Sequence, residues 1–294
     1  MSETTTTTLT EIIPEIIGEA TLWMTERSLF WPRTGVAEQF LQWADLRGKP
    51  GIKYTFPKYA AIQFGDTTEG DSYTTTSAMD TGGSTAITAA MKQCNVFVSD
   101  ESVDALAGDK NAIIAQVGQA LGQAAAEKFD SDVMAAFSSL GATPTGGNAT
   151  NSPLIASEFQ AYITALKTAK APGPYAAFFH PWGWYEFLGE SSSPLLSTAA
   201  SDQVAKDIWR DYYETTVFGV KCFTSAGQST ANAGADYMGA FISNRAMGAV
   251  WKRDLTVNTQ RDELKRGQYL VGTMFYGVGV IDSTLGFQML QDAD

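Results

Sequence analysis

The last third of the chain, from Tyr237 to Leu290, constrains the fold most, because it is a succession of strand-like segments. These segments are residues 239–243, 247–251, 255–259, 268–281 and 285–289. Alternation of apolar and polar residues, with Val, Ile, Tyr and Phe enriched, is typical of half-buried antiparallel strands. A charged hinge at residues 261–266 interrupts the pattern. A region so rich in strands and so poor in reactive side chains indicates a structural building block rather than a catalyst.

The size and composition of the chain fit a large core. The chain has 294 residues, of which 44% are hydrophobic. It can therefore form one large domain or two to three subdomains. Charged residues make up 18%, below the ~25% of typical globular domains. This composition suits a protein whose surface is covered by neighbours, and it also suits many secreted proteins.

The charge excludes several classes of protein. The net charge is −12, and Lys and Arg form no cluster, so sequence-specific binding of DNA or RNA is not expected. Cys94 and Cys222 lie in apolar, strand-like runs and are expected to be small buried side chains rather than a disulfide or zinc site. The N-terminus lacks the features of a secretion signal. No apolar run is long enough for a membrane span, which predicts synthesis in the cytoplasm.

A long helix is the clearest element in the first half. Apolar residues repeat every fourth position within residues 101–139, and Gly141 follows the end of the pattern. The repeating positions are Ile113, Val117, Leu121, Ala125, Phe129 and Val133. About 28 helical residues would span roughly 42 Å, well above the ordinary length of a helix.

An extended two-stranded loop is expected before this helix. Residues 51–59 and 86–98 both read as strands, and the polar, Gly-rich residues 65–77 lie between them. Arms of about 12 residues would reach roughly 40 Å. An isolated hairpin of this kind is only marginally stable in water, so it needs a surface to lie against.

The N-terminal residues 1–45 are predicted to form an arm. A Thr-rich start is followed by a cluster of apolar residues, which Pro14, Gly18 and Pro32 prevent from forming one long helix. An arm this hydrophobic needs a surface, which is either its own subunit or a neighbouring one.

The middle of the chain alternates helices and strands. Ser157 and Gln160 have the spacing of a capping box at the start of a helix, and Pro172 ends it. A buried strand at residues 175–179 leads through His180 into an aromatic helix. A short helix at residues 204–213 and a strand at residues 217–223 complete the pattern.

No catalytic, cofactor or metal site is predicted. His180 is the only histidine and is expected to be a turn residue at a strand end. Asp66, Glu69 and Asp71 lack the order of calcium-loop ligands. Asp130 and Asp132 would point apart on a helix. The aromatic cluster, comprising Trp182, Trp184, Tyr185 and Phe187, has near-helical spacing that favours a core role over stacking on a sugar.

The order of these parts resembles the major capsid proteins of tailed bacteriophages (Caudoviricetes) with the Hong Kong 97 fold. The stretches that carry the resemblance are residues 178–188 (FFHPWGWYEFL), 217–223 (VFGVKCF), 239–251 and 276–282 (YGVGVID). The resemblance implies an α+β fold with an N-terminal arm, an extended E-loop, a long spine helix, a peripheral domain and an axial domain.

The resemblance also implies a division of the chain. The arm would be residues 1–45, the E-loop residues 46–98, and the spine helix with part of the peripheral domain residues 99–141. Residues 142–240 would be mainly axial domain. Residues 241–294 would be axial-domain strands that return to the peripheral domain.

The function that the resemblance implies is that of a non-enzymatic structural protein of the virion. It would self-assemble as pentamers and hexamers into an icosahedral shell around double-stranded DNA, which it contacts only non-specifically. Expected partners are a separate scaffolding protein, a portal protein and a decoration or cement protein, without membrane or cofactor. Some relatives cross-link an E-loop lysine. Lys53 and Lys58 are available, but no cross-link is predicted.

Contacts between subunits are expected from the arm and the extended loop, because both are poor features for a monomer. The residues are Ile12, Ile13, Ile16, Ile17, Trp23, Phe30, Trp31, Lys53, Tyr54, Phe56, Tyr59 and Tyr73. Two alternatives stay open. One is an encapsulin-type compartment with a protein cargo, and the other is a carbohydrate-binding or hydrolytic protein that uses the aromatic cluster.

Overall fold

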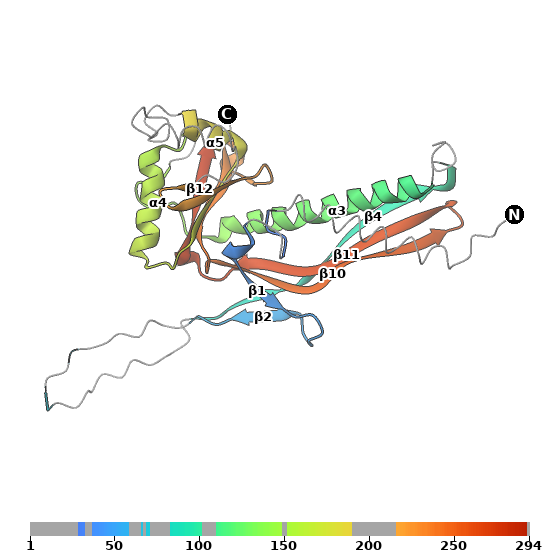
Figure 1. Ribbon diagram of the computed structural model, residues 1–294, viewed down its shortest axis with the longest axis horizontal. Coiled ribbons are helices and arrows are strands. Elements are labelled where there is room, and N and C mark those ends of the chain that lie inside the picture. Colours follow the sequence, from blue (N-terminus) through green and yellow to red (C-terminus); the bar gives the residue numbers. More distant parts are fainter. Residues whose placement is uncertain are drawn as a thin grey trace.

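A computed structural model describes residues 29–32, 37–58, 66, 69–70, 83–101, 110–148, 152–189 and 216–292. The described part is an α+β body with one elongated and one more compact region (Figure 1). The elongated region consists of the long helix α3 beside a ribbon of long strands. The compact region holds the helices α4 and α5 around a second sheet.

The helices and strands follow one another in a mixed order. The α-helices are α3 (Lys110–Ala135), α4 (Ala156–Thr168) and α5 (Pro181–Gly189), and the 3-10 helices are η1 (Glu38–Phe40), η2 (Ala136–Ser139), η3 (Asn232–Gly234) and η4 (Ser283–Leu285). The strands are β1 (Leu41–Asp45), β2 (Lys53–Phe56), β3 (Thr85–Thr88), β4 (Ala90–Ser99), β5 (Tyr175–Phe179), β6 (Thr216–Val217), β7 (Val220–Thr224), β8 (Thr230–Ala231), β9 (Asp236–Ser243), β10 (Met247–Asp262), β11 (Gly267–Val280) and β12 (Gly286–Asp292).

The elongated region is built on a four-stranded sheet in the order β1-β10-β11-β4. β10 and β11 form a long antiparallel hairpin, β1 pairs parallel to β10, and β4 pairs antiparallel to β11 over its full length. The β10–β11 register shifts between Trp251 and Arg253 and again before Thr256. Such bulges bend a strand and increase its twist.

Helix α3 packs along this sheet with the face that the sequence pattern predicts. Leu121 packs with Val257 and Leu270, and Phe129 contacts Trp251 and Tyr276 at ring-centroid distances of 5.5 and 5.0 Å. Val133 is also fully buried. The period of four residues therefore identified the buried side of the long helix correctly.

The compact region has a second, six-stranded sheet in the order β12-β9-β5-β7-β6, with β8 paired to β9. Phe159 and Tyr162 of α4 contact Phe241 of β9, and Phe187 of α5 contacts Phe179 of β5. The core of this region is therefore mainly aromatic. The predicted strands of the last third are confirmed as β9 to β12.

Three predictions of elements need correction. The expected strand at residues 86–98 divides at Ala89: β3 pairs with β2, whereas β4 joins the sheet beneath α3. Helix α4 begins at Ala156, and the Glu158 carboxylate accepts a hydrogen bond from the Ile155 amide, so Ser157 and Gln160 do not form its capping box. Residues 217–223 contain a tight turn that separates β6 from β7. The expected helix at residues 204–213 lies outside the described residues.

Candidate assembly surfaces

The end of the N-terminal arm is built into the core of its own subunit. The Asp130 carboxylate on α3 accepts hydrogen bonds from the backbone amides of Leu29 and Phe30 at 2.8 and 3.1 Å. The Phe30 ring lies 5.0 Å from that of Phe178 on β5, and the Trp31 ring lies 5.1 Å from that of Trp251 on β10. These residues therefore join α3 to both sheets.

This placement corrects the expectation that Phe30 and Trp31 contact a neighbouring subunit. Both side chains are buried, because the aromatic core between α3 and the two sheets encloses them, so a neighbour cannot reach them in this conformation. Of the two surfaces considered for the arm, its own subunit is the one that these residues use. The other expected arm contacts lie outside the described residues, namely Ile12, Ile13, Ile16, Ile17 and Trp23.

The root of the expected loop is the hairpin β2–β3, which is held by four residue pairs from Lys53 with Thr88 to Phe56 with Thr85. Phe56 is 5% exposed and belongs to a small core cluster with Ile87 and Val250, so it anchors the hairpin. Lys53 is exposed and Tyr54 is 37% exposed. Tyr59 and Tyr73 lie outside the described residues.

An ion pair fixes the chain just beyond this hairpin. The Lys58 ammonium lies 2.7 Å from the Asp282 carboxylate. Burial opposes the charge of Asp282, but the ion pair and the hydrogen bonds from Thr284 outweigh it and lower the pKa of that carboxyl. Lys58 is thus held against the body of its own subunit.

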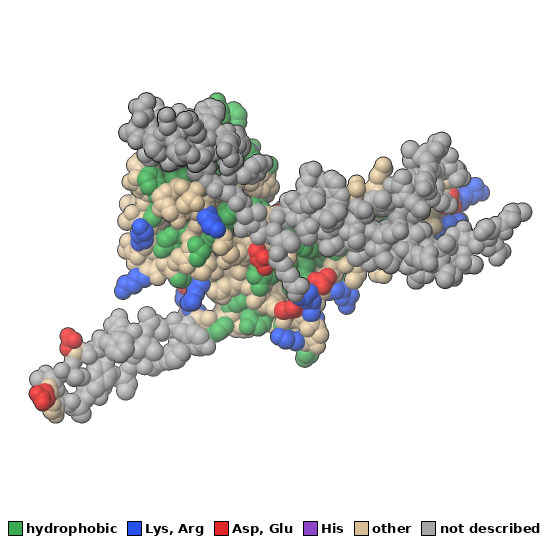
Figure 2. Space-filling view, viewed as in Figure 1, with side chains coloured by type: hydrophobic (Ala, Val, Ile, Leu, Met, Phe, Trp, Pro, Cys, Tyr) green, Lys and Arg blue, Asp and Glu red, His purple; other side chains and the backbone are tan. Residues whose placement is uncertain are grey.

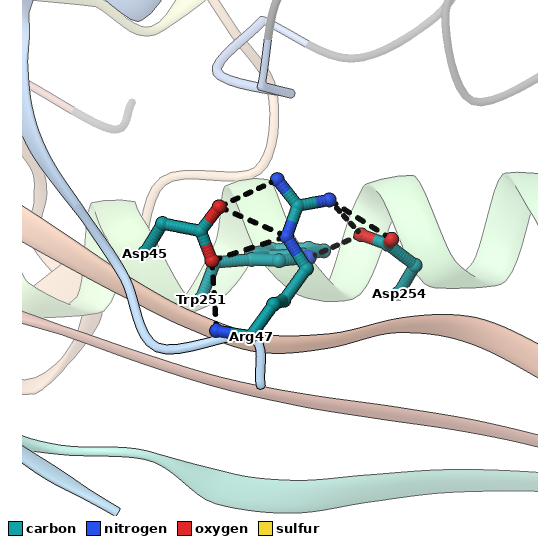
Figure 3. Close-up of polar contacts among 4 residues, drawn as sticks. All are labelled: Asp45, Arg47, Trp251 and Asp254. Atoms are coloured by element: carbon teal, nitrogen blue, oxygen red, sulfur yellow. Dashed lines mark hydrogen bonds and ion pairs between the residues drawn. The ribbon is translucent and has the colours of Figure 1, made fainter. Parts of the chain in front are cut away.

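A cluster around Arg47 joins the turn after β1 to the bulge of β10 (Figure 3). The guanidinium donates to the carboxylates of Asp45 and Asp254 at distances of 2.8 to 3.2 Å. The Trp251 indole N–H donates to Asp254 at 2.6 Å. Hydrogen bonds from Arg47 lower the pKa of Asp45 to about 2, so Asp45 stays charged at neutral pH.

The Arg47 cluster borders a cavity of about 340 Å³ lined by the indoles of Trp31, Trp43 and Trp251. Its lining contains no histidine, cysteine or hydroxyl side chain among the described residues. The Asp45 and Asp254 carboxylates of this lining are both bound to Arg47, so the cluster holds two segments of the chain together.

One face of the four-stranded sheet carries exposed apolar side chains. Val96 of β4 packs on the α3 side with Leu121. Met91 and Phe97 therefore point to the opposite face, because residues alternate along a strand. Met91 and Phe97 are exposed, and the Phe97 ring lies 4.8 Å from that of Tyr269 on β11.

The tip of the β10–β11 hairpin is a feature that the sequence analysis missed. Of residues 261–266, interpreted there as a charged hinge, Arg261 and Asp262 end β10, and residues 263–266 form the turn to β11. Leu264 on this turn is 97% exposed. The sequence nevertheless contained the pattern of a hairpin, since two strand-like runs separated by a short polar segment are typical of one.

His180 has the structural role that the sequence predicted. It lies between β5 and α5, its amide donates to Gln291 Oε1 at 2.7 Å, and its ring stacks on Tyr237. Its Nδ1 accepts a hydrogen bond from the Trp182 amide at 3.3 Å, and burial lowers its pKa. These contacts make it part of the join between strand and helix.

The aromatic cluster on α5 divides between core and surface. Trp184 and Phe187 are buried as expected, but Trp182 and Tyr185 are exposed, and their rings lie 5.6 Å apart. The core interpretation is therefore right for two of the four residues and wrong for the other two. A helix of about 3.6 residues per turn presents neighbouring positions to different sides.

The cysteines also differ from each other. Cys222 is buried as expected, and burial raises the pKa of its thiol to about 12. Cys94 is exposed, contrary to expectation, because it lies on the edge strand β4.

The ranges that the structure describes contain neither a metal-binding cluster nor a helix that could span a membrane. Within them, no group of three or more His, Cys, Asp or Glu side chains could hold a metal ion. None of the helices that the structure describes is long and apolar enough to cross a membrane.

The sequence and the fold are both similar to those of phage capsid proteins. A family model described as phage capsid protein matches residues 95–288. A search of curated protein sequences gives no match. The fold is similar to the capsid of Ralstonia phage GP4, with 11% identity and a TM-score of 0.66 over 88% of this chain and 89% of that chain.

Two further solved structures share the fold. The cyanophage Pam1 capsid has 12% identity and a TM-score of 0.64 over 92% of this chain and 93% of that chain. A virus-like particle from Pyrococcus furiosus has 12% identity and a TM-score of 0.59 over 95% of this chain and 99% of that chain. These likenesses confirm the mixed α+β capsid fold that the resemblance implied.

Proposed function

The chain belongs to the phage capsid protein family, and from that membership we propose that it self-assembles as pentamers and hexamers into an icosahedral shell around double-stranded DNA. It is a non-enzymatic structural protein of the virion capsid. The net charge of −12 supports a shell that contacts its genome only non-specifically, because clustered cations would be needed to bind phosphates tightly.

The observation that carries this proposal is the hairpin β2–β3 at the edge of the body. Four residue pairs join its two strands, and three of the four β2 residues are exposed. A two-stranded hairpin is marginal by itself, so support from a neighbouring subunit would stabilise it. We assign the hairpin to the root of the E-loop, α3 to the spine helix, and Lys53 and Tyr54 to contacts between subunits.

The partners of the shell follow from the same proposal. A separate scaffolding protein would guide assembly in the host cytoplasm. A portal protein would occupy one position of the shell, and a decoration or cement protein would bind outside. In rings of identical subunits the contacts are heterologous, so two different surfaces of one chain meet. The exposed faces of β2 and of β4 can supply such surfaces.

Electron microscopy of the purified protein, co-expressed with a neighbouring scaffold gene, tests the proposal. Closed shells of uniform diameter with fivefold and sixfold units are the expected result. Particles of one or two subunits, at every protein concentration and with scaffold present, would contradict it. Expression without scaffold is the control, and it is expected to give fewer or irregular shells.

A protein compartment is the second candidate, because the fold is also similar to the virus-like particle from Pyrococcus furiosus. The contents of shells isolated from the natural host distinguish the two functions. Nuclease-protected double-stranded DNA is expected for the capsid. A co-purifying cargo protein without protected DNA would favour the compartment.

A further inference from the structure

The compact region carries its acidic and its basic side chains at opposite ends. Among its described residues (152–189, 216–246 and 286–292), the carboxylates are Glu158, Glu186, Asp236 and Asp292, and the lysines and arginines are Lys167, Lys170, Lys221 and Arg245. Asp236 pairs with Asp292 where β9 begins and β12 ends. Asp292 also acts on Glu186 of α5, whose pKa is raised by burial and by this neighbouring charge. These three carboxylates therefore mark one end of the second sheet.

The basic side chains lie where β9 ends and β5 begins. Lys167 and Lys170 are exposed at the C-terminal end of α4, where the Lys170 amide donates to the Lys167 carbonyl at 3.0 Å. Arg245 is exposed just after β9, and the hydroxyl of Ser243, the last residue of β9, donates to the Pro172 carbonyl. The end of α4 and the end of β9 are therefore side by side.

A fourth cation comes from the neighbouring strand. Lys221 of β7 is exposed and pairs in register with Ala176, the second residue of β5. Figure 2 shows basic side chains on the side of the compact region where α4 lies. We call the group comprising Lys167, Lys170, Lys221 and Arg245 the basic end.

The charges of the basic end are not neutralised within the described chain. None of its four side chains forms an ion pair with a described residue. A carboxylate does lie close by, because the Asp282 amide donates to the Ala246 carbonyl, next to Arg245. That carboxylate is already bound to Lys58 at 2.7 Å. The four positive charges are therefore available to a partner.

The dipole of α4 explains only part of this arrangement. The C-terminal end of a helix carries a partial negative charge of roughly half an elementary charge, which favours a cation in the last turn. This effect accounts for Lys167. Lys221 and Arg245 belong to other elements, so the helix does not account for them. Half a negative charge also leaves most of the positive charge uncompensated.

We propose that the basic end binds the phosphate backbone of the packaged double-stranded DNA. The proposal rests on the shell function above and names the surface through which the shell would contact its genome. Contacts to phosphates carry no sequence information, so they agree with binding that is not sequence-specific. The four residues are dispersed between positions 167 and 245, and only the fold brings them to one end.

DNA fits this surface better than an acidic protein surface does. All four cations are exposed, and exposed ion pairs between proteins contribute little. A cation that neutralises a DNA phosphate releases condensed counterions, and this release drives binding even at exposed positions. The chain as a whole has a net charge of −12 and repels DNA. Contact with DNA is therefore expected at the basic end rather than over the whole surface.

Binding of a short labelled duplex of mixed sequence to unassembled subunits tests the proposal by fluorescence anisotropy. For three to four phosphate contacts, the association constant should fall roughly 40- to 150-fold between about 50 and about 200 mM salt. The triple variant Lys167→Gln, Lys170→Gln and Arg245→Gln should bind at least tenfold more weakly at the lower salt concentration. Its melting temperature should stay close to the original, because these side chains are exposed.

A matched control separates the basic end from net charge. The triple variant Arg253→Gln, Lys265→Gln and Arg266→Gln removes the same charge from exposed positions of the β10–β11 hairpin. It should bind the duplex as the original chain does. Equal weakening by both triple variants, or no weakening by the first, would overturn the proposal.

A photochemical cross-link identifies the partner in filled shells. Lys170→Cys is prepared together with Cys94→Ser, since Cys94 is the exposed native thiol and Cys222 is buried, and is labelled with a photoreactive thiol reagent. Illumination should give a protein–DNA adduct that nuclease removes. Tyr185→Cys on α5, at the acidic end, is the control and should give none. Joined protein chains without a DNA adduct at position 170 would overturn the proposal and assign the basic end to an acidic surface of another chain.

The outcomes keep this inference distinct from the proposed function. Normal shells of the original chain that contain DNA but give no adduct at position 170 would overturn the basic end and leave the shell function standing. An original chain that never forms shells would contradict the shell function. Loss of duplex binding in the first triple variant alone would then still support a phosphate-binding surface at the basic end.

Discussion

Asp130 holds Leu29 through a hydrogen bond of 2.8 Å between the carboxylate and the backbone amide, across 101 residues of sequence. The same carboxylate accepts the next amide, that of Phe30, at 3.1 Å. One charged side chain on α3 thereby fixes the direction in which the arm leaves the body. The aromatic packing of Phe30 and Trp31 depends on this direction, because both rings enter the core directly after these amides.

Removal of this carboxylate should destabilise the subunit. Asp130→Ala leaves two backbone amides without their charged acceptor, which is expected to cost about 2 kcal/mol. The melting temperature should fall by roughly 4 °C for a chain of this size. Calorimetry measures the change, with Glu127→Ala as control, because Glu127 is exposed and, among the described residues, bonds only to the Gln123 side chain. An unchanged melting temperature for Asp130→Ala would contradict the anchoring role.

Acid should weaken the join between α3 and the sheet. Asp132 bonds to Tyr276, Lys92 and Lys128 at 2.9, 3.1 and 2.8 Å. Burial opposes its charge, but these bonds outweigh burial and lower the pKa of Asp132. Because the folded pKa lies below the unfolded value of about 3.9, the stabilisation is fully present above that value. It is lost as the pH falls through the folded pKa.

Chemical unfolding at a series of pH values checks this sign. The difference in unfolding free energy between the original chain and Asp132→Asn should be constant near neutral pH and should shrink below about pH 4. A difference that stays the same down to pH 3 would show that the charge of Asp132 contributes no pH-dependent stability.

Gly272 and Gly277 of β11 differ in how closely other atoms approach them. They therefore test whether β3 packs directly against β11. A Cβ at Gly277 would lie 2.4 Å from the Thr88 carbonyl oxygen, whereas a Cβ at Gly272 would lie no closer than 3.5 Å to Leu121 and Leu255. Gly277→Ala should therefore destabilise the fold by roughly 1–3 kcal/mol through overpacking against backbone. Gly272→Ala should be close to neutral. Equal unfolding midpoints in urea would refute the close approach of β3 to β11.

The two cysteines should differ sharply in reaction with a thiol reagent. The thiolate is the reactive form, and Cys222 is buried with its pKa raised to about 12, whereas Cys94 is exposed. The native protein should therefore release one equivalent of chromophore quickly from Ellman's reagent, and two after denaturation. Cys94→Ser should abolish the fast equivalent, and its persistence would place Cys222 at the surface.

The hairpin root offers a test that separates assembly from folding. Tyr54→Ala removes an exposed side chain and should reduce shell formation several-fold with little change in melting temperature. Phe56→Ala removes a buried anchor and should lower stability by about 3–5 kcal/mol. Light scattering and calorimetry measure the two effects. Full assembly by Tyr54→Ala would argue against a contact at that residue.

The sequence predicted elements better than it predicted their partners. The strands β9 to β12 and the buried side of α3 follow from periods of two and four residues, which are local properties. The division at Ala89 is not local. Its amide donates to the Ile52 carbonyl at 2.8 Å, and the residues of β4 that follow pair with β11, 168 to 186 positions further along. Nothing in the pattern of residues 86–98 marks that change of partner.

The solvent exposure of individual side chains was the other property that the sequence did not predict. Cys94 and Leu264 are apolar in type, yet one lies on an edge strand and the other at a hairpin tip, and only the paired structure reveals both positions. Conversely, the apolar residues Phe30 and Trp31 suited either their own subunit or a neighbour. Asp130 decides between these two surfaces, because it binds the backbone amides of Leu29 and Phe30. From the sequence alone, Asp130 is an ordinary charged residue on the surface of a helix.

The parallel pairing of β1 with β10 and the antiparallel pairing of β4 with β11 set an order on folding during synthesis. Both early strands take their partners from residues 247–280, near the end of the chain. A ribosome that has translated only the first two hundred residues holds Trp43 and the whole of β4 without their sheet. Chains that end before β11 therefore never complete the four-stranded sheet, and they lack the exposed face that β4 presents in it.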